Sequence, residues 1–189
     1  MTFEQAKNVM LASYQAEVEY RGRTFNHDNL TISNIEKIAC YLIDPKTKFG
    51  IMLSGTCGNG KTTMLLAFQS AMCYLSANRI FDNKGIRIED AKDIISFTKD
   101  RQIYNKFRDT EMLGIEDMGR EPTEVVDYGN VLNPITDLLE YRYSKQLFTF
   151  ITTNLKPKEV REKYGNRIAD RFNEMFYNIV FENNSYRDT

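Results

Sequence analysis

The eight residues from Gly55 to Thr62 constrain this chain more than any other part of its sequence. They read Gly-Thr-Cys-Gly-Asn-Gly-Lys-Thr and match the pattern G-x-x-x-x-G-K-[ST] at every position. An apolar stretch precedes them, and a helical pattern with Met64, Leu65 and Phe68 follows. In this strand–loop–helix setting, backbone N–H groups surround phosphate oxygens at a helix N-terminus whose dipole favours negative charge. The sequence therefore predicts a nucleoside triphosphate site.

Two side chains of this loop have specific chemical roles. Lys61 places a positive charge against the β and γ phosphates, and the Thr62 hydroxyl is a ligand for Mg²⁺. Cys57 is interpreted as a small loop residue, and the alternative for the whole motif is a glycine-rich turn before a helix. ATP and Mg²⁺ are the expected cofactors, and the residues expected to bind the nucleotide are Gly55, Thr56, Cys57, Gly58, Asn59, Gly60, Lys61, Thr62 and Thr63.

Beyond residue 45, short apolar runs alternate with helical stretches, which indicates an α/β fold with a parallel sheet. Before it, an amphipathic helix is expected over 2–19 and a second from the capping box at Ser33–Glu36 to Asp44. We expect one compact three-layer unit, in which residues 1–44 flank the nucleotide site and residues 45–189 form the nucleotide-binding domain. The five expected strands are 49–54, 85–88, 112–116, 147–152 and 178–181, and the helices between them are 61–76, 90–107, 130–143 and 157–173.

Polar side chains follow two of the expected strands. Glu116 and Asp117 come directly after an apolar run, and Asn154 ends the strand before the last helix. The carboxyl ends of parallel strands face the ligand, so these acids are candidates to hold Mg²⁺ and to polarise the attacking water. Asn154 is a candidate to orient that water. The alternatives are two acids in a turn before Gly119, and an ordinary turn asparagine.

Composition narrows the function. Hydrophobic residues make up 42% of the chain and charged residues 27%, and the apolar runs are too short for a membrane helix or a signal peptide. Three cysteines without paired spacing favour a reducing cytoplasm, and the single histidine, His27, excludes a histidine-rich metal site. Because the net charge is −1, contact with nucleic acid has to come from a local patch or from several subunits together.

The motifs, in this order and spacing, resemble those of the AAA+ ATPases of the DnaC-type helicase loader group and its IstB-type transposon relatives. Thr152-Thr-Asn154-Leu is similar to the sensor 1 strand of that group, and the segment from Tyr164 to Phe172 is similar to its G-x-R-[IV]-x-[DS]-R helix. The resemblance implies an AAA+ P-loop fold with a minimal lid domain or none, ATP hydrolysis, and an ATP-dependent oligomer. A replicative helicase and single-stranded DNA are the implied partners, and no membrane is implied.

The resemblance also implies roles for single residues. Lys61 and Thr62 would be Walker A, Glu116 and Asp117 Walker B, and Asn154 sensor 1. Arg167 or Arg171, four residues apart and so on one helical face, would be an arginine finger that enters the neighbouring subunit. Arg187 would be a sensor 2 arginine. The alternative for the two finger candidates is a surface ion pair with Glu162, Asp170 or Glu174.

A DNA-facing segment is implied between the second and third strands, where residues 97–108 interleave aromatic and basic side chains. Phe97 and Phe107 could instead belong to the core. The candidate contacts are Lys99, Arg101 and Lys106.

The function expected first is an ATP-dependent protein that assists helicase loading in DNA replication. An IstB-like regulator of transposition shares every motif, whereas a nucleotide kinase shares only the P-loop. Because Glu116 precedes Asp117, in the reverse of the usual order of the two acids, an adaptor that binds ATP without hydrolysing it is a further alternative.

Overall fold

The computed structural model describes residues 1–44, 48–82, 85–127, 130–183 and 185–186. Two helices come first, and from β1 onward strands and helices are interspersed, with two helices in succession at α4–α5 and three strands in succession at β3–β5. Their bounds are α1 Phe3–Tyr20, α2 Asn29–Ile43, β1 Gly50–Gly55, α3 Lys61–Ala77, β2 Arg87–Asp90, α4 Ala91–Phe97, α5 Arg101–Arg108, β3 Met112–Met118, β4 Val125–Asp127, β5 Asn130–Leu132, α6 Pro134–Lys145, β6 Phe148–Thr153, α7 Pro157–Met175 and β7 Phe176–Phe181.

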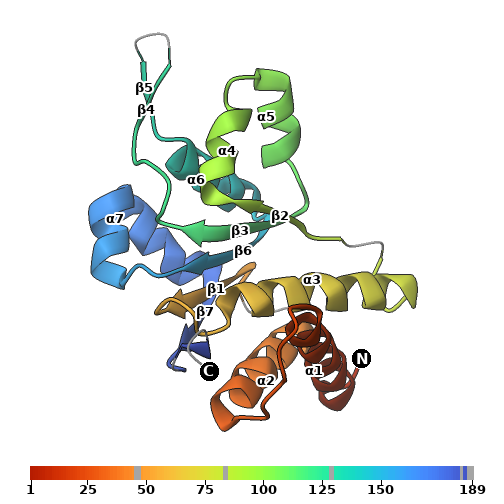
Figure 1. Cartoon of the computed structure of the whole chain (residues 1–189). Helices are drawn as coiled ribbons and strands as arrows, with labels where there is room; N and C mark the ends of the chain where they lie inside the picture. Colours follow the sequence, from red (N-terminus) through yellow and green to blue (C-terminus); the bar gives the residue numbers. More distant parts are fainter. Residues whose placement is uncertain (45–47, 83–84, 128–129, 184, 187–189) are drawn as a thin grey trace.

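Five of the strands form one parallel sheet in the order β2-β3-β6-β1-β7 (Figure 1). The predicted five-stranded parallel sheet is confirmed, with strand bounds that shift by at most two residues. In this order β1 lies between β6 and the edge strand β7, so the P-loop that follows β1 begins between these two strands at the carboxyl edge. No α-helix follows β7 in the part of the chain that the structure describes.

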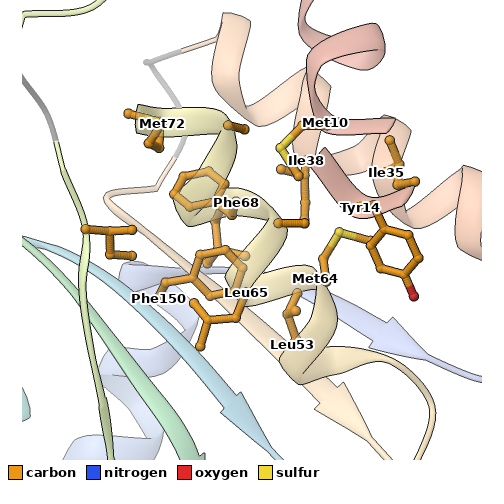
Figure 2. Close-up of a cluster of buried hydrophobic side chains, with 14 of the residues drawn as sticks. Met10, Tyr14, Ile35, Ile38, Leu53, Met64, Leu65, Phe68, Met72 and Phe150 are labelled. Carbon is orange, nitrogen blue, oxygen red and sulfur yellow. The ribbon is translucent and has the colours of Figure 1, made fainter. Parts of the chain in front are cut away.

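Helices cover both faces of the sheet and make three layers (Figure 1). Helices α1, α2 and α3 lie on one face, and α4 to α7 lie on the other. A first hydrophobic core lies between the sheet and α1–α3, and a second lies between the sheet and α4–α7. Successive side chains of β1 point to opposite faces, so Ile51 and Leu53 enter the first core whereas Met52 packs against the second. Figure 2 shows the first core, to which α1 and α2 contribute Met10, Tyr14, Ile35 and Ile38, and to which α3 and the sheet contribute Leu53, Met64, Leu65, Phe68, Met72 and Phe150.

Helix α2 begins earlier than the capping box predicted. Its N-cap is Asp28, whose Oδ1 accepts a hydrogen bond of 2.8 Å from the backbone N–H of Thr31. Ser33 lies inside the helix, so the prediction of a start at Ser33 is wrong. Asp28 is as good a cap as serine, and further contacts of its carboxylate, described below, hold it in place.

Two other expected helices differ from the structure. The predicted helix over 90–107 is broken into α4 and α5 at Thr98–Asp100, because the Asp100 carboxylate accepts the N–H groups of Gln102 and Ile103 and starts a new helix. The predicted helix over 130–143 begins only at Pro134. Strand β5 precedes it and pairs antiparallel with β4 in a hairpin that the sequence did not reveal.

A fully buried arginine joins the helical layer to the sheet. Arg142 of α6 has no exposed surface. Its guanidinium donates to the hydroxyl of Thr149 at 2.8 Å and to the carbonyls of Arg108, Thr110 and Phe148 at 2.9, 2.8 and 2.6 Å. Burial lowers the pKa of Arg142 to about 10. These bonds connect the end of α5 and the residues after it with the start of β6.

We expect Arg142→Met to lower the free energy of unfolding by about 2–4 kcal/mol, since it leaves several buried acceptors without a partner. Chemical denaturation measures the change. Lys145→Met, an exposed position one turn away on α6, is the matched control and should change stability by less than about 0.5 kcal/mol. Equal stability of the two variants would contradict a structural role for the Arg142 network.

Candidate nucleotide-binding site

The P-loop requires glycine at two positions of close approach. A Cβ added at Gly55, where φ is +143°, would lie 2.3 Å from the Phe181 carbonyl oxygen of β7. Gly60, with φ +97°, is the N-cap of α3, and a Cβ there would lie 2.7 Å from the Tyr14 hydroxyl. The loop is therefore pressed between the last strand of the sheet and helix α1.

The Lys61 side chain is folded into this loop and is only 5% exposed. Its ammonium group donates to the carbonyls of Gly55 and Thr56 at 2.8 and 2.6 Å, and to the side-chain oxygen of Asn59 at 3.1 Å. The Asn59 amide in turn donates to the Phe181 carbonyl at 2.9 Å. The Lys61 ammonium group is thus held at the start of α3. Its charge and the helix dipole both favour binding of an anion there.

A hydrogen bond joins the P-loop to the acidic strand end. The Thr62 hydroxyl donates to Glu116 Oε1 at 2.7 Å, from the first turn of α3 to the end of β3. Both atoms are hard oxygen donors. No cluster of three or more His, Cys, Asp or Glu side chains that could hold a metal occurs within the described residues. The Thr62 hydroxyl and the Glu116 carboxylate nevertheless fit Mg²⁺, which uses one or two protein oxygens together with substrate phosphates.

Asp117 lies in a different environment from its neighbour. The register of β3 against β6 shifts between Ile115 and Met118, and Asp117 in this bulge has a left-handed φ of +52°. Its backbone N–H donates to the Thr152 hydroxyl at 2.9 Å. Its carboxylate accepts from Arg120 Nη1 at 2.5 Å. The bulge therefore turns the two consecutive acids toward different partners.

The loop that follows Asp117 is anchored to α7 by a buried carboxylate. Glu121 is 3% exposed, and its Oε2 accepts the backbone N–H of Gly119 at 2.8 Å. Its Oε1 accepts the Tyr164 hydroxyl, and the Lys163 ammonium group lies 3.5 Å from the same oxygen. Lys163 also donates to the carbonyls of Gly119 and Glu121 at 2.7 and 2.5 Å. Burial, together with the bond to Glu121, raises the pKa of Tyr164.

A cleft of about 1110 Å³ lies at this edge of the sheet. Residues 57–63 of the P-loop line it together with Glu116, Asp117 and Asn154, whereas Gly55 and Thr56 do not. Sequence reasoning missed the remainder, because the contacts come from loops far apart in the chain and have no motif. The missed lining residues include Tyr14, Arg21, Arg23, Phe25, Arg120 and Tyr186.

Tyr186 lines the cleft and is hydrogen-bonded to three other segments of the chain. Its backbone N–H donates to the Gly58 carbonyl in the P-loop at 2.9 Å. Its hydroxyl lies 2.9 Å from Asp28 Oδ2 and 2.9 Å from the Thr31 hydroxyl, and it accepts from Asn183 Nδ2 at 2.6 Å. Partial burial raises the pKa of Tyr186. Arg187, the sensor 2 candidate, lies outside the described residues.

The two finger candidates lie away from this cleft. Arg167 and Arg171 share a face of α7, as their spacing predicted, and both contact Glu140 Oε1 of α6, at 3.3 and 3.2 Å. Arg171 also stacks over the Tyr143 ring at 4.6 Å. Neither arginine lines the cleft of its own chain. They are ion-paired here, but with Glu140 rather than with the acids that the sequence suggested.

The DNA candidates lie in or next to α5, on the face of the sheet opposite α3 (Figure 1). Lys99, Arg101 and Lys106 are exposed around α5 and do not line the cleft. The aromatics between them are packed, since Phe107 is fully buried and its ring lies 5.0 Å from that of Phe97. The segment is divided between two helices, since Phe97 ends α4 and Arg101 begins α5. The cations are therefore accessible, but these two aromatic rings belong to the core.

With this fold and site, the chain has the architecture of AAA+ P-loop proteins. It is similar to solved structures of DnaI (22% identity, TM-score 0.66, covering 96% of this chain and 93% of that one) and of the DnaC helicase loader (19% identity, TM-score 0.65, covering 84% and 93%). AMPPCP-bound DnaA from Aquifex aeolicus is also similar, at 17% identity and a TM-score of 0.59 over 86% of this chain and 50% of that one.

At these identities the likeness concerns the fold, and at that level the resemblance to the DnaC-type AAA+ group is confirmed. No protein-family model matches the chain, and no curated protein matches it. Among the described residues, no helix has the length and apolar character needed to cross a membrane.

We expect Lys61→Ala to reduce ATP affinity by at least about tenfold, because it removes the cation at the start of α3. Isothermal titration calorimetry measures the affinity, and thermal unfolding verifies that the variant folds. Lys145→Ala, exposed on α6, should bind ATP like the wild type. Unchanged binding by Lys61→Ala would show that the nucleotide does not use the P-loop.

Proposed function

We propose that this chain is an ATP-binding and ATP-hydrolysing AAA+ protein that assists DNA replication, in the manner of a helicase loader, by assembling on single-stranded DNA. The hydrogen bond between Thr62 and Glu116 carries the proposal, because it joins the phosphate-binding loop to the acidic strand end across the cleft. That pairing is what a magnesium-dependent phosphoryl-transfer site needs.

The cleft residues divide the work of hydrolysis. Lys61 stabilises the β and γ phosphates, and Asn154 with Asp117 orients the attacking water. The water oxygen bonds to the γ-phosphorus as the bond to the bridging oxygen breaks and ADP leaves, and the displaced proton passes to the acceptor oxygens around the γ-phosphate. Thr62 and Glu116 would hold Mg²⁺, which neutralises charge on the phosphates.

The replication role is supported by what the similar structures are. One is described as the DnaC helicase loader, and another is the initiator DnaA bound to AMPPCP and single-stranded DNA, at 17% identity and a TM-score of 0.57. In this chain Lys99, Arg101 and Lys106 are exposed at and just before α5. Because the net charge is −1, we propose that several subunits bind DNA together, with ATP promoting their association.

Asp117→Asn tests the hydrolytic role and separates the two acids. We expect Mg·ATP affinity to stay within about threefold and steady-state turnover to fall about a hundredfold, since the group that orients water is lost. Glu116→Gln should weaken Mg·ATP binding as well as turnover. Normal turnover by Asp117→Asn with none by Glu116→Gln would reverse the two roles.

The same ATPase assay with single-stranded DNA addresses the replication role. Stimulation of the wild type by DNA supports this role, or that of an IstB-like regulator, over that of a kinase. Phosphoryl transfer to a small acceptor, with no effect of DNA, would instead identify a kinase.

A mixing experiment tests the proposed finger in trans. Arg171→Ala subunits lack a finger candidate but keep the pocket, and Lys61→Ala subunits lack the pocket but keep the finger. At mixed junctions an intact arginine meets an intact pocket, so we expect the mixture to exceed the summed activity of the two variants.

Arg161→Ala on the same helix, whose arginine pairs with Asp170, is the matched control for Arg171→Ala and should retain wild-type activity. If neither Arg171→Ala nor Arg167→Ala complements Lys61→Ala, the two arginines act only as partners of Glu140.

A further inference from the structure

Arg120 is a cation at the candidate nucleotide cleft that none of the sequence motifs includes. It lies three residues after Asp117, and its Nη1 donates to Asp117 Oδ2 at 2.5 Å. Its side chain lines the same cleft as Cys57 and Lys61 of the P-loop. The position follows from the chain reversal at Gly119, where φ is +111°, which returns the loop toward the strand end.

The surroundings of Arg120 are acidic. The hydrogen bond with Asp117 raises the pKa of Arg120, and the charges of Asp117 and Asp90 add to the effect. Asp90 lies at the end of β2, where its carboxylate caps α4 by accepting the backbone N–H of Lys92 at 2.8 Å. Asp117 is therefore the acid that Arg120 contacts directly, and Arg120 remains positively charged in any physiological buffer.

The pair between Arg120 and Asp117 is suited to exchange. The Arg120 side chain is 53% exposed, and an ion pair so exposed contributes little to stability. A guanidinium group binds phosphate oxygens through paired N–H donors, and a terminal phosphate has more charge than one carboxylate. A γ-phosphate placed by the P-loop would therefore compete with Asp117 for Arg120.

We propose that Arg120 distinguishes ATP from ADP: its guanidinium pairs with Asp117 in the conformation described here and contacts the γ-phosphate when ATP binds. The exchange releases the Asp117 carboxylate to orient the attacking water. Asp117 is thus held away from its role until a triphosphate is bound. This inference deepens the proposed function and rests on nucleotide binding at the P-loop.

The test compares affinities for ATP and for ADP, measured by calorimetry in the presence of Mg²⁺. We expect Arg120→Ala to weaken ATP binding about tenfold and ADP binding less than about threefold, because only ATP offers the γ-phosphate. Arg120→Lys keeps the charge without the paired donors, so its ATP affinity should lie between those of the wild type and Arg120→Ala. Arg87→Ala, which removes an exposed arginine paired with Glu89 at 2.7 Å outside the cleft, should leave the ratio of the two affinities unchanged.

A purely structural role for Arg120 would move both affinities together, so an unchanged ratio of ATP to ADP affinity in Arg120→Ala overturns the proposal. Thermal unfolding verifies that each variant is folded. The readout does not depend on turnover. If the wild type binds both nucleotides but does not hydrolyse ATP, the proposed ATPase activity fails while the affinity ratio still decides the role of Arg120.

Discussion

The candidate site depends on the position of β1 between β6 and β7, two strands from near the end of the sequence. Strand β1 pairs with β7 over its whole length and with β6 from Gly50 to Ser54. The fit is close, since a Cβ added at Gly50 would lie 2.6 Å from the Thr149 carbonyl oxygen. The P-loop is also held against β7, because the Asn59 amide donates a hydrogen bond to the Phe181 carbonyl. Its shape therefore requires contacts over more than a hundred residues, which form late when folding begins with local structure.

The parts of the site that the sequence predicted are those with a local cause. A P-loop is a contiguous motif, and an acid or an amide that follows a strand lies at the carboxyl edge once the sheet is parallel. Glu116, Asp117 and Asn154 could thus be placed in one cleft with Lys61 before any coordinates were known. Four of the five strands were found for the same reason, because each is a short, largely apolar run between helical patterns, whereas β2 reads Arg-Ile-Glu-Asp and its predicted bounds are shifted by two residues.

The parts that the sequence did not predict depend on contacts between distant segments. Arg120 and Tyr186 reach the cleft through a chain reversal and a late loop, and neither feature has a periodic pattern. The break between α4 and α5 depends on Asp100, which competes with helix continuation by capping the next helix. In the same way, Glu140 could not be named as the partner of Arg167 and Arg171, because it lies on another helix.

The loop from Asp117 to Glu121 has a fixed length. Asp117 is placed by the bulge in β3, Gly119 reverses the chain, and the buried Glu121 is held by Lys163 and Tyr164 of α7. An inserted residue would have to displace either the carboxylate in the cleft or the carboxylate in the core. We therefore expect substitutions in this loop to be tolerated better than insertions or deletions. Arg120 is the residue of the loop whose replacement leaves the backbone path intact.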